Sequence, residues 1–379
     1  CRLEDIAYVA SGSTPDKTCF VENGVPYIKM YNLRNQKIDF AYHPQYITEE
    51  VHNGKLQRSR TEVGDLIMNI VGPPLGKLAI IPTTLPQANF NQAAVLIRPY
   101  KFKEVLVSYL KVYLEEMSEI NSIATRGSAG QVNISLTQSQ NMRIPIPPLN
   151  EVRRIIEEVS KYDILIDSLK QNITDIQNLI AYTKSKILDL AIHGKLVPQD
   201  PNDEPAIELL KRINPDFTPC DNGHYTQLPE GWAICKMKQI TSITNGKSQK
   251  NVETLNGIYP IYGSGGVIGR ANQYLCIAGS TIIGRKGTIN NPIFVEEHFW
   301  NVDTAFGLKA NDAILDKYLY YFCLSFDFSK LDKSTAMPSL TKTSIGNVLI
   351  PIPPYKEQER IVAKIDMVLD TMNEILRAV

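Results

Sequence analysis

The hydrophobic positions of the chain change their period part-way along it, and the same change occurs a second time. Short runs rich in β-branched residues, such as Asp65–Val71 and Ser280–Gly284, lie between turns rich in glycine and proline, as strands do. After Pro148, and again after Pro354, apolar residues recur every three or four positions. A double proline can precede a helix but cannot lie inside one. The pattern therefore predicts two copies of a strand-rich domain followed by a helix.

The predicted helices carry the apolar stripe of a coiled coil, in which two helices pack along each other. We expect the first helix to run from Asn150 to Ile192, about 64 Å, which is longer than a compact domain needs. The stripe of the first helix comprises Val159, Tyr162, Ile166, Leu169, Ile173, Ile176, Ile180, Thr183, Ile187 and Leu190, and that of the second comprises Ile361, Ile365, Val368, Met372, Ile375 and Val379.

The two copies are related by residue type as well as by pattern. The segment Asn141–Pro148 matches Asn347–Pro354 at most positions, and the same register continues into both helices. Further upstream the register holds if the second copy has shorter loops, so that Gly12 falls on Gly246. Such an internal repeat predicts two domains of one fold. Because Cys1 falls inside the repeated pattern, we expect the chain to be a fragment or to lack a disordered start.

The fold class that follows is α+β. We expect two repeated mixed α/β domains, separated by two long antiparallel coiled-coil helices and related by a pseudo-twofold axis. The expected parts are a first domain at 1–149, a central spacer helix at 150–198, a linker at 199–227, a second domain at 228–354 and a C-terminal coiled-coil helix at 355–379.

Composition narrows the class of protein. A chain of 379 residues exceeds one ordinary core, and 43% hydrophobic with 21% charged residues is typical of globular proteins. Basic and acidic residues balance at 40 each, which argues against a uniformly basic binder of nucleic acid. The six cysteines form no C-x-x-C pair, and no apolar run reaches the roughly 18 residues of a membrane span. We therefore expect reduced thiols, no metal site and a soluble cytoplasmic protein.

Three short motifs point to chemistry that the surrounding sequence does not support. Gly263–Gly269 is close to a dinucleotide fingerprint, but its third glycine is displaced and no βαβ pattern follows. Gly246–Ser248 is similar to a phosphate loop, but Thr241 stands where that loop needs glycine. Ile352–Tyr355 is similar to the Asn-Pro-Pro-Tyr pocket of adenine methyltransferases, but Ile352 lacks the amide that binds the adenine amino group. We expect no catalytic residue in this chain.

Three segments carry a more specific signal. They are Leu228–Trp232 at the start of the second copy, Ile350–Pro354 followed by Glu357 and Gln358, and Ala191–Val197 at the end of the first helix. Together with the repeat and the heptads, they resemble the specificity subunit of type I restriction-modification systems, the HsdS family. The resemblance covers nearly the whole chain. The first copy departs from it by lacking the Leu-Pro-Glu-Gly-Trp opening, and the last helix ends before a matching exit motif.

The resemblance implies a function. In that family each domain is a target-recognition domain that reads one half of a bipartite site in double-stranded DNA, and the helices fix the unread spacer. The specificity subunit is not itself an enzyme. It binds two DNA methyltransferase (M) subunits, and restriction/translocase (R) subunits join the full complex. S-adenosylmethionine, ATP and Mg are accordingly expected on partner subunits and not in this chain.

Polar loops of both copies contain side chains suited to base edges and phosphates. The loops at 126–131 and 333–337 are the strongest candidates, because they occupy one place in the repeat but differ in sequence. In the first copy, the predicted DNA-binding residues are Lys29, Asn32, Arg34, Asn35, Lys77, Gln92, Arg126, Ser128, Gln131 and Asn133. In the second copy, they are Lys247, Gln249, Lys250, Ser264, Arg270, Arg285, Lys286, Asn290, Asn291, Lys333 and Lys342.

Residues that recur at both domain-to-helix junctions are candidates for docking a partner. If one kind of methyltransferase subunit binds twice, it needs two similar surfaces. The alternative is a helix start that simply packs on its own domain. The predicted docking residues are Pro145, Pro148, Glu151, Arg154, Pro354, Glu357 and Arg360.

Two other functions stay open on sequence alone. The chain could be the recognition region of a single-chain restriction-modification enzyme, which predicts a methyltransferase domain upstream of Cys1. It could also be a coiled-coil scaffold without a role on DNA, which predicts no sequence preference in DNA binding.

Overall fold

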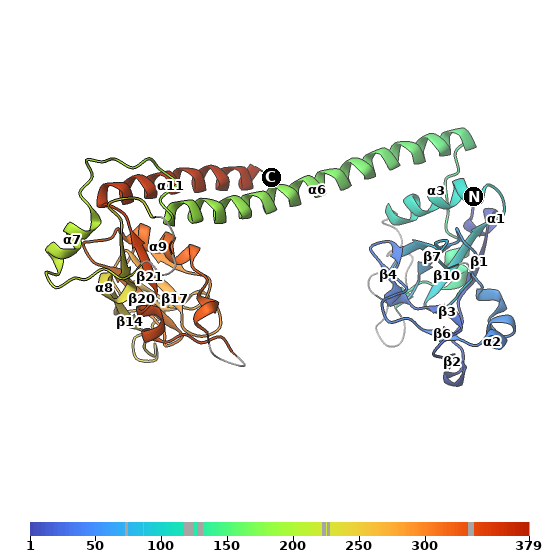
Figure 1. The fold of residues 1–379 in the computed structure, drawn as a ribbon. Coiled ribbons are helices and arrows are strands. Elements are labelled where there is room, and N and C mark those ends of the chain that lie inside the picture. Colours follow the sequence, from blue (N-terminus) through green and yellow to red (C-terminus); the bar gives the residue numbers. More distant parts are fainter. Residues whose placement is uncertain are drawn as a thin grey trace. The chain divides into compact units, whose positions relative to one another are not determined.

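The chain forms two compact units, unit 1 at Cys1–Leu169 and unit 2 at Lys170–Val379 (Figure 1). None of the helices described is long and apolar enough to cross a membrane. The computed structural model describes residues 1–72, 75–85, 87–116, 125–126, 132–221, 225, 228–332 and 337–378.

Unit 1 is built on a four-stranded antiparallel sheet that is covered on both faces. Its strands, in spatial order, are β1 (Ala7–Ser11), β10 (Ala94–Pro99), β7 (Leu66–Asn69) and β8 (Leu78–Ile80). Leu66 and Met68 pack with helix α3 (Lys103–Glu116), whereas Ile67 between them packs with a second layer. Successive side chains of a strand point to opposite faces. Burial of both faces explains why the segment around β7 is continuously apolar and does not alternate.

The second layer of unit 1 is a small mixed sheet, in which β3 and β9 run parallel. Its strands, in spatial order, are β2 (Phe20–Val21), β6 (Tyr46–Ile47), β3 (Val25–Ile28) and β9 (Asn89–Phe90). Between β3 and β6 the chain makes an excursion that contains η2 (Met30–Asn32), β4 (Leu33–Arg34) and β5 (Lys37–Ile38). The other elements of unit 1 are α1 (Leu3–Ile6), η1 (Lys17–Cys19), α2 (Glu49–Asn53), η3 (Gln57–Ser59), β11 (Thr125–Arg126), β12 (Val132–Asn133) and α5 (Leu136–Gln140).

Unit 2 repeats this topology, which confirms the predicted internal repeat and the α+β class. Its main sheet has the order β14 (Thr241–Asn245), β20 (Ala305–Ala310), β17 (Ser280–Gly284) and β18 (Ile293–Val295). Helix α9 (Asp316–Ser325) packs on it as α3 packs in unit 1. The second layer has the order β16 (Gly266–Ala271), β15 (Tyr259–Gly263) and β19 (Trp300–Asn301), and β15 and β19 run parallel. The other elements of unit 2 before its last helix are α7 (Ala206–Ile213), β13 (Ala233–Lys236), α8 (Met237–Ile240), η4 (Phe328–Leu331), α10 (Lys342–Gly346) and β21 (Leu349–Ile352).

One glycine per unit has the same packing role. A Cβ on Gly12 would collide with the backbone carbonyl of Asn91, and a Cβ on Gly246 would collide with that of Val302. Only glycine allows the backbone to approach another backbone this closely. The alignment of Gly12 with Gly246 in the sequence therefore reflects one shared contact between the layers.

Two long helices follow the two sheets along the chain. Helix α6 (Leu149–Ile192) has 44 residues and α11 (Tyr355–Ala378) has 24. In unit 2 the C-terminal part of α6 lies antiparallel to α11 (Figure 1). Lys184 donates to Asn373 Oδ1 at 3.4 Å, while Gln199, just beyond α6, donates to Glu357 near the start of α11 at 2.9 Å. The predicted antiparallel packing is confirmed for this stretch.

The apolar stripe of α6 is only partly covered. Ile180 is 8% exposed and Ile361 in α11 is fully buried, but Tyr162 and Ile166 are 62% and 46% exposed. The described part of α11 has 24 residues against 44 in α6, so the helix pairing extends over about half of α6 in the described residues. The pseudo-twofold relation of the units stays a prediction.

Candidate nucleic-acid interface

The predicted DNA-binding loops of unit 1 meet at one end of its main sheet, where β7 ends and β10 begins. The β7–β8 loop returns there, since the backbone N–H of Asn69 donates to Lys77 O at 2.9 Å. The backbone N–H of Ile70 donates to Ala93 O at 2.8 Å, and that of Ile134 donates to Ile70 O at 2.8 Å. We call this surface the loop end of unit 1 and define it by residues 29–43, 70–72, 75–77, 91–93 and 132–134.

The hairpin β4–β5 is tied to the same end. Gln36 Oε1 accepts a hydrogen bond from the backbone N–H of Leu78 in β8 at 2.7 Å. The backbone N–H of Asn91 donates to Ile28 O at 3.1 Å, which places the residue after Ile28 beside the β9–β10 turn. Of the predicted DNA-binding residues, the structure brings Lys29, Arg34, Asn35, Lys77, Gln92 and Asn133 to the loop end of unit 1.

The other predicted residues of this copy differ in how far the structure describes them. Arg126 belongs to the short strand β11 and pairs through its backbone with Val132 of β12, which is part of the loop end. Ser128 and Gln131 lie outside the described residues, as does Lys333 of the second copy.

Asn32 is a correction, because its side chain does not face solvent. It is 1% exposed and its amide donates to the backbone oxygens of Asp39 at 3.1 Å and Tyr42 at 2.7 Å. Its Oδ1 accepts from the backbone N–H of Lys29 at 2.9 Å. A buried amide with three such bonds stabilises the loop that contains it. Asn32 thus shapes the excursion between β3 and β6 and does not contact DNA directly.

Sequence reasoning missed the aromatic residues of this excursion. Tyr31 and Tyr42 are 37% and 41% exposed, and their rings pack edge to face with centroids 6.2 Å apart. The guanidinium of Arg34 lies 4.1 Å from the centroid of the Tyr42 ring. Exposed aromatic residues interleaved with arginine in a polar loop were the available signal, because such rings stack on bases or hold an arginine in place.

In unit 2, several predicted residues converge on the corresponding end. The backbone N–H of Arg285 donates to Thr304 O at 2.7 Å, and the backbone N–H of Lys247 donates to Asn301 O at 3.0 Å. Ser264 lies in the β15–β16 turn, close enough that a Cβ on Gly284 would be 3.2 Å from its own Cβ. Lys286, Gln249 and Lys250 follow in the same loops. These residues form the loop end of unit 2.

Other predicted residues of unit 2 have different surroundings. Asn290 is exposed, and its side chain donates to Asp327 at 2.7 Å and accepts from the backbone N–H of Phe328 at 2.7 Å, so it helps to hold η4 in place. Its contact with DNA stays a prediction. Asn291 beside it is exposed. Arg270 donates to Ile258 O at 3.2 Å, at the base of the β15–β16 hairpin and away from its turn. Lys342 opens α10 and lines a separate cavity near Lys238 and Thr241.

The two predicted docking junctions differ from each other. In unit 1 the junction is open, with Pro145, Pro148, Glu151 and Arg154 all exposed. In unit 2 the linker covers it, and Pro354 and Glu357 are buried. Two similar exposed surfaces were expected, so this part of the docking prediction was wrong. A contact between these residues and a partner stays a prediction for the exposed members.

Glu357 instead joins the linker to the start of α11. Its carboxylate accepts from Trp232 Nε1 at 3.0 Å and from Gln199 Nε2 at 2.9 Å. Burial raises the pKa of Glu357 above its ordinary value. The two hydrogen bonds and the nearby Arg360 lower the pKa, but by less than burial raises it. Arg360 forms an ion pair with Asp203 at 2.6 Å. The Leu-Pro-Glu-Gly-Trp segment therefore has a structural role, which is to bury and satisfy Glu357.

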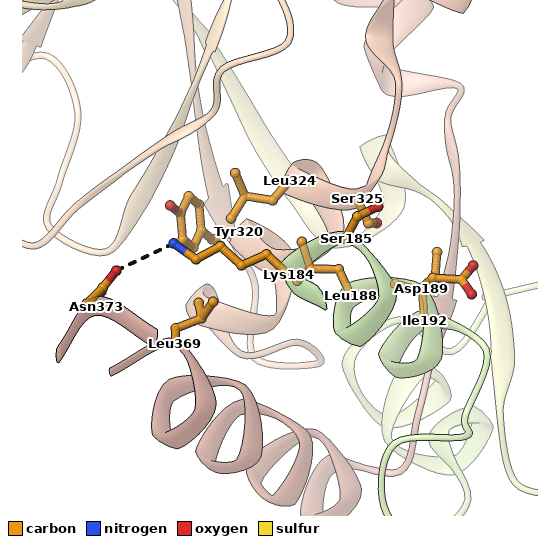
Figure 2. Close-up of a pocket in the computed structure, with 10 residues that line it drawn as sticks. All are labelled: Lys184, Ser185, Leu188, Asp189, Ile192, Tyr320, Leu324, Ser325, Leu369 and Asn373. Atoms are coloured by element: carbon orange, nitrogen blue, oxygen red, sulfur yellow. Dashed lines mark hydrogen bonds between the residues drawn. The ribbon is translucent and has the colours of Figure 1, made fainter. Parts of the chain in front are cut away.

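A cavity of 620 Å³ lies among α6, α9 and α11 in unit 2 (Figure 2). Figure 2 shows Lys184 reaching across it to Asn373, with Tyr320 and Leu369 on either side. Asp189 is the one carboxylate among the lining residues, which include no histidine or cysteine. The cavity has neither a paired acid and base nor a set of metal ligands. It reflects helix packing.

The glycine-rich motifs adopt structures that differ from those of nucleotide-binding sites. Gly263 and Gly266 form the turn of the antiparallel hairpin β15–β16, whereas a dinucleotide fingerprint links a strand to a helix. Within the described parts of the chain, no group of three or more His, Cys, Asp or Glu side chains could hold a metal ion.

All six cysteines are unpaired, and burial raises the pKa of Cys235 and of Cys276 to about 12, so both thiols stay neutral.

The chain contains one fold in two copies, and the polar residues differ between the two loop ends. A long helix lies between the two sheets in the sequence. These features define a protein with two recognition domains. Residues 1–178 and 229–379 match the type I restriction modification DNA specificity domain, and the chain belongs to this family.

Similar proteins are themselves specificity subunits. The chain is 25% identical over 338 residues to the type I restriction enzyme EcoAI specificity subunit of Escherichia coli, a match that covers 66% of this chain and 57% of that protein. It is 22% identical over 391 residues to the putative type I restriction enzyme MjaX specificity subunit of Methanocaldococcus jannaschii, covering 99% and 87%. The match thus spans little more than half of the EcoAI subunit.

Two solved structures share the fold. The HsdS subunit from Thermoanaerobacter tengcongensis has a TM-score of 0.59 and 18% identity, and the match covers 100% of this chain and 90% of that one. A chain from a structure of complex assembly in the type I R-M system has a TM-score of 0.64 and 19% identity, covering 100% and 91%.

Proposed function

We propose that this chain is the DNA-reading subunit of a type I restriction-modification complex, in which each unit reads one half of a bipartite site. The observation that carries the proposal is the contrast between shared topology and different loops. Unit 1 places an excursion with η2 and the β4–β5 hairpin after β3, whereas unit 2 continues from β15 into the β16 hairpin. One scaffold with two sets of loops is what two different half-sites require.

The charge of the chain supports a division of DNA contacts between this chain and its partner subunits. The net charge is zero, so this chain supplies little general attraction for the phosphate backbone. Base reading by a few loop side chains remains compatible with that charge, because specificity comes from base edges and not from phosphates. Methyltransferase partner subunits that enclose the DNA would supply the missing phosphate contacts. Restriction/translocase subunits would join the same assembly.

The same proposal leaves the chemistry to the partners. This chain would transfer no methyl group, hydrolyse no ATP and cleave no DNA, and S-adenosylmethionine, ATP and Mg would bind to the M and R subunits. Calorimetric titration of the isolated chain with S-adenosylmethionine checks this, and a saturable heat of binding would contradict it. The exposed junction residues Pro145, Pro148, Glu151 and Arg154 are the proposed contacts to an M subunit.

The deciding experiment is selection of bound sequences from a randomised pool of double-stranded DNA, with the chain alone and with its M subunits. We expect two short fixed sequences separated by a constant unread gap. A coiled-coil scaffold would enrich no sequence, which would overturn the proposal. Deleting the β4–β5 hairpin at 33–38 should degrade one half of the selected sequence and leave the other half unchanged.

A further inference from the structure

Three features fix the backbone of the hairpin β4–β5 at the loop end of unit 1, namely its turn and the hydrogen bonds of two side chains. Asn35 and Gln36 form its turn with positive φ angles of 49° and 55°, as a tight two-residue hairpin turn requires. Gln36 is anchored to Leu78 at 2.7 Å, and buried Asn32 holds the segment on either side of the hairpin. The strand residue just before the turn, Arg34, is therefore presented from a fixed position.

The side chain of Arg34 is also oriented. Its guanidinium lies 4.1 Å from the Tyr42 ring centroid, and its Nε lies 3.8 Å from Asp39 Oδ2. Tyr42 itself packs against Tyr31 and His43, with ring centroids 6.2 Å and 4.4 Å away. The Arg34 side chain is still 48% exposed. Stacking on Tyr42 and the nearby charge of Asp39, whose Oδ2 lies beyond hydrogen-bond distance, favour one plane for the guanidinium, while the side chain stays accessible to a ligand.

We propose that Arg34 reads a guanine, through O6 and N7 in the major groove, in the half-site bound by unit 1. The inference rests on the proposed function and names one specificity-determining residue within it. A planar fork with two parallel donors matches the two acceptors of guanine, and this is the commonest specific contact of arginine with DNA. Ordering the side chain before binding reduces the conformational entropy lost on contact.

A phosphate contact fits the geometry less well. Phosphates can be bound by cations without a fixed plane, and Lys29 and Lys77 at the same loop end have the charge for such contacts. The aromatic ring and the carboxylate beside Arg34 favour one plane for its guanidinium, which suits a ligand with two coplanar acceptors such as a guanine edge. An arginine fork can also bind two oxygens of a phosphate, and the salt dependence of binding in the test below distinguishes the two ligands. Unit 2 has no matching excursion after β15 in its described residues, so the effect should be limited to one half-site.

The test is sequence selection by the chain in complex with its M subunits, comparing the wild type with Arg34→Ala and Arg34→Lys. We expect both variants to lose discrimination at one G·C pair by roughly 10- to 100-fold, since lysine keeps the charge but not the fork. All other positions of both half-sites should be unchanged. Arg2→Ala is the matched control, because Arg2 is also exposed and paired with an aspartate, Asp5, but lies at the other end of the β1 strand.

Tyr42 tests the orienting contact as a positioning residue. Tyr42→Leu should weaken the preference for the same G·C pair without changing the salt dependence of binding. Tyr42→Phe should keep the wild-type preference because the ring is kept. Melting curves of each variant check that the fold is intact.

Each outcome decides between the alternatives. Uniform weakening at every sequence, with a smaller salt slope for Arg34→Ala, would make Arg34 a phosphate contact and overturn the inference. An unchanged selected sequence would overturn it as well. If the wild-type complex selects no sequence at all, then the proposed function itself fails, which is a different result from a wild-type preference that survives the Arg34 variants.

Discussion

At the scale of single residues, the buried polar groups decide how the loops are held. Asp65 is fully buried at the start of β7, where it accepts from Arg98 at 2.6 Å and Lys103 at 2.7 Å. It also accepts from the backbone N–H of Glu62 at 2.7 Å. This cluster joins β7, β10 and the start of α3, so it fixes the sheet from which the loop end of unit 1 projects.

Asp65→Ala should lower the free energy of unfolding of unit 1 by about 3 kcal/mol, because it removes the buried carboxylate and leaves Arg98 and Lys103 with only the more exposed Glu62 as a partner. Chemical denaturation followed by circular dichroism measures the change. Glu158→Ala is the control, since its ion pair with Lys161 lies on the surface, where solvent screens it, and should contribute little to stability. Equal losses in the two variants would contradict the role of burial.

Glu357 makes a prediction about pH. Burial raises its pKa above the ordinary value of 4.5 in the folded protein, so the folded state holds the proton more tightly than the unfolded state. Above the pKa that Glu357 has in the folded protein, its buried charge lowers the free energy of unfolding. As pH falls toward 4.5 the carboxylate is protonated in the folded protein, and this loss of stability disappears. Relative to Glu357→Gln, the wild type should gain stability as pH falls through that window. Parallel pH profiles of the two melting temperatures would show that Glu357 does not titrate there.

At the scale of elements, the helix pair is stable only where both apolar faces meet. Ile365 of α11 is fully buried in the same core cluster as Leu188 of α6, whereas Ile166 of α6 is 46% exposed. A helix gains most of its stability in a protein from packing of its apolar face. Apolar residues of the same heptad pattern therefore contribute more to stability in the C-terminal part of α6 than in its N-terminal part.

Ile365→Ala should lower the free energy of unfolding of unit 2 by about 2–4 kcal/mol, because it leaves a cavity in a closed core. Ile166→Ala should change stability by less than about 0.5 kcal/mol in the isolated chain, since the residue is already exposed. Denaturant unfolding of both variants checks the contrast. If Ile166→Ala were as destabilising as Ile365→Ala, the N-terminal part of α6 would have to be packed in solution.

At the scale of the whole molecule, the long helix is the element that would set the distance between half-sites. Four residues inserted after Asn172 lengthen α6 by about 6 Å, while one base pair advances DNA by about 3.4 Å. We therefore expect the preferred gap to grow by one or two base pairs, with both half-site sequences unchanged because no reading loop is altered. Mapping of methylated sites by the reconstituted complex measures the gap.

The control for this insertion is four residues placed after Pro215, in an exposed turn that follows α7. That variant should keep the original gap, because it lengthens no spacer helix. An unaltered gap in the Asn172 variant, together with changed half-sites, would move base reading onto the helices and contradict the proposed division of tasks.

The loops show what the sequence predicts and what depends on the folded structure. Lys29, Arg34 and Lys77 are polar loop residues in the sequence, and the structure brings them to one end of unit 1, while their contact with DNA stays a prediction. Their meeting depends on hydrogen bonds between segments distant in the chain, such as Gln36 with Leu78, which no local pattern encodes. Asn32 looked like a surface amide for the same reason, because its acceptors Asp39 and Tyr42 are provided by the folded loop.

The sequence by itself determined the repeat, the α+β class and the two long helices, because these follow from local periodicity and from residue matches between the copies. Tertiary structure decided which of those residues are exposed. Burial depends on what packs opposite a residue, and so the recurrent Glu151 and Glu357 differ, the first exposed and the second covered by Trp232 and Gln199. The same holds for Arg34, whose orientation arises only when Tyr42 and Asp39 are folded against it.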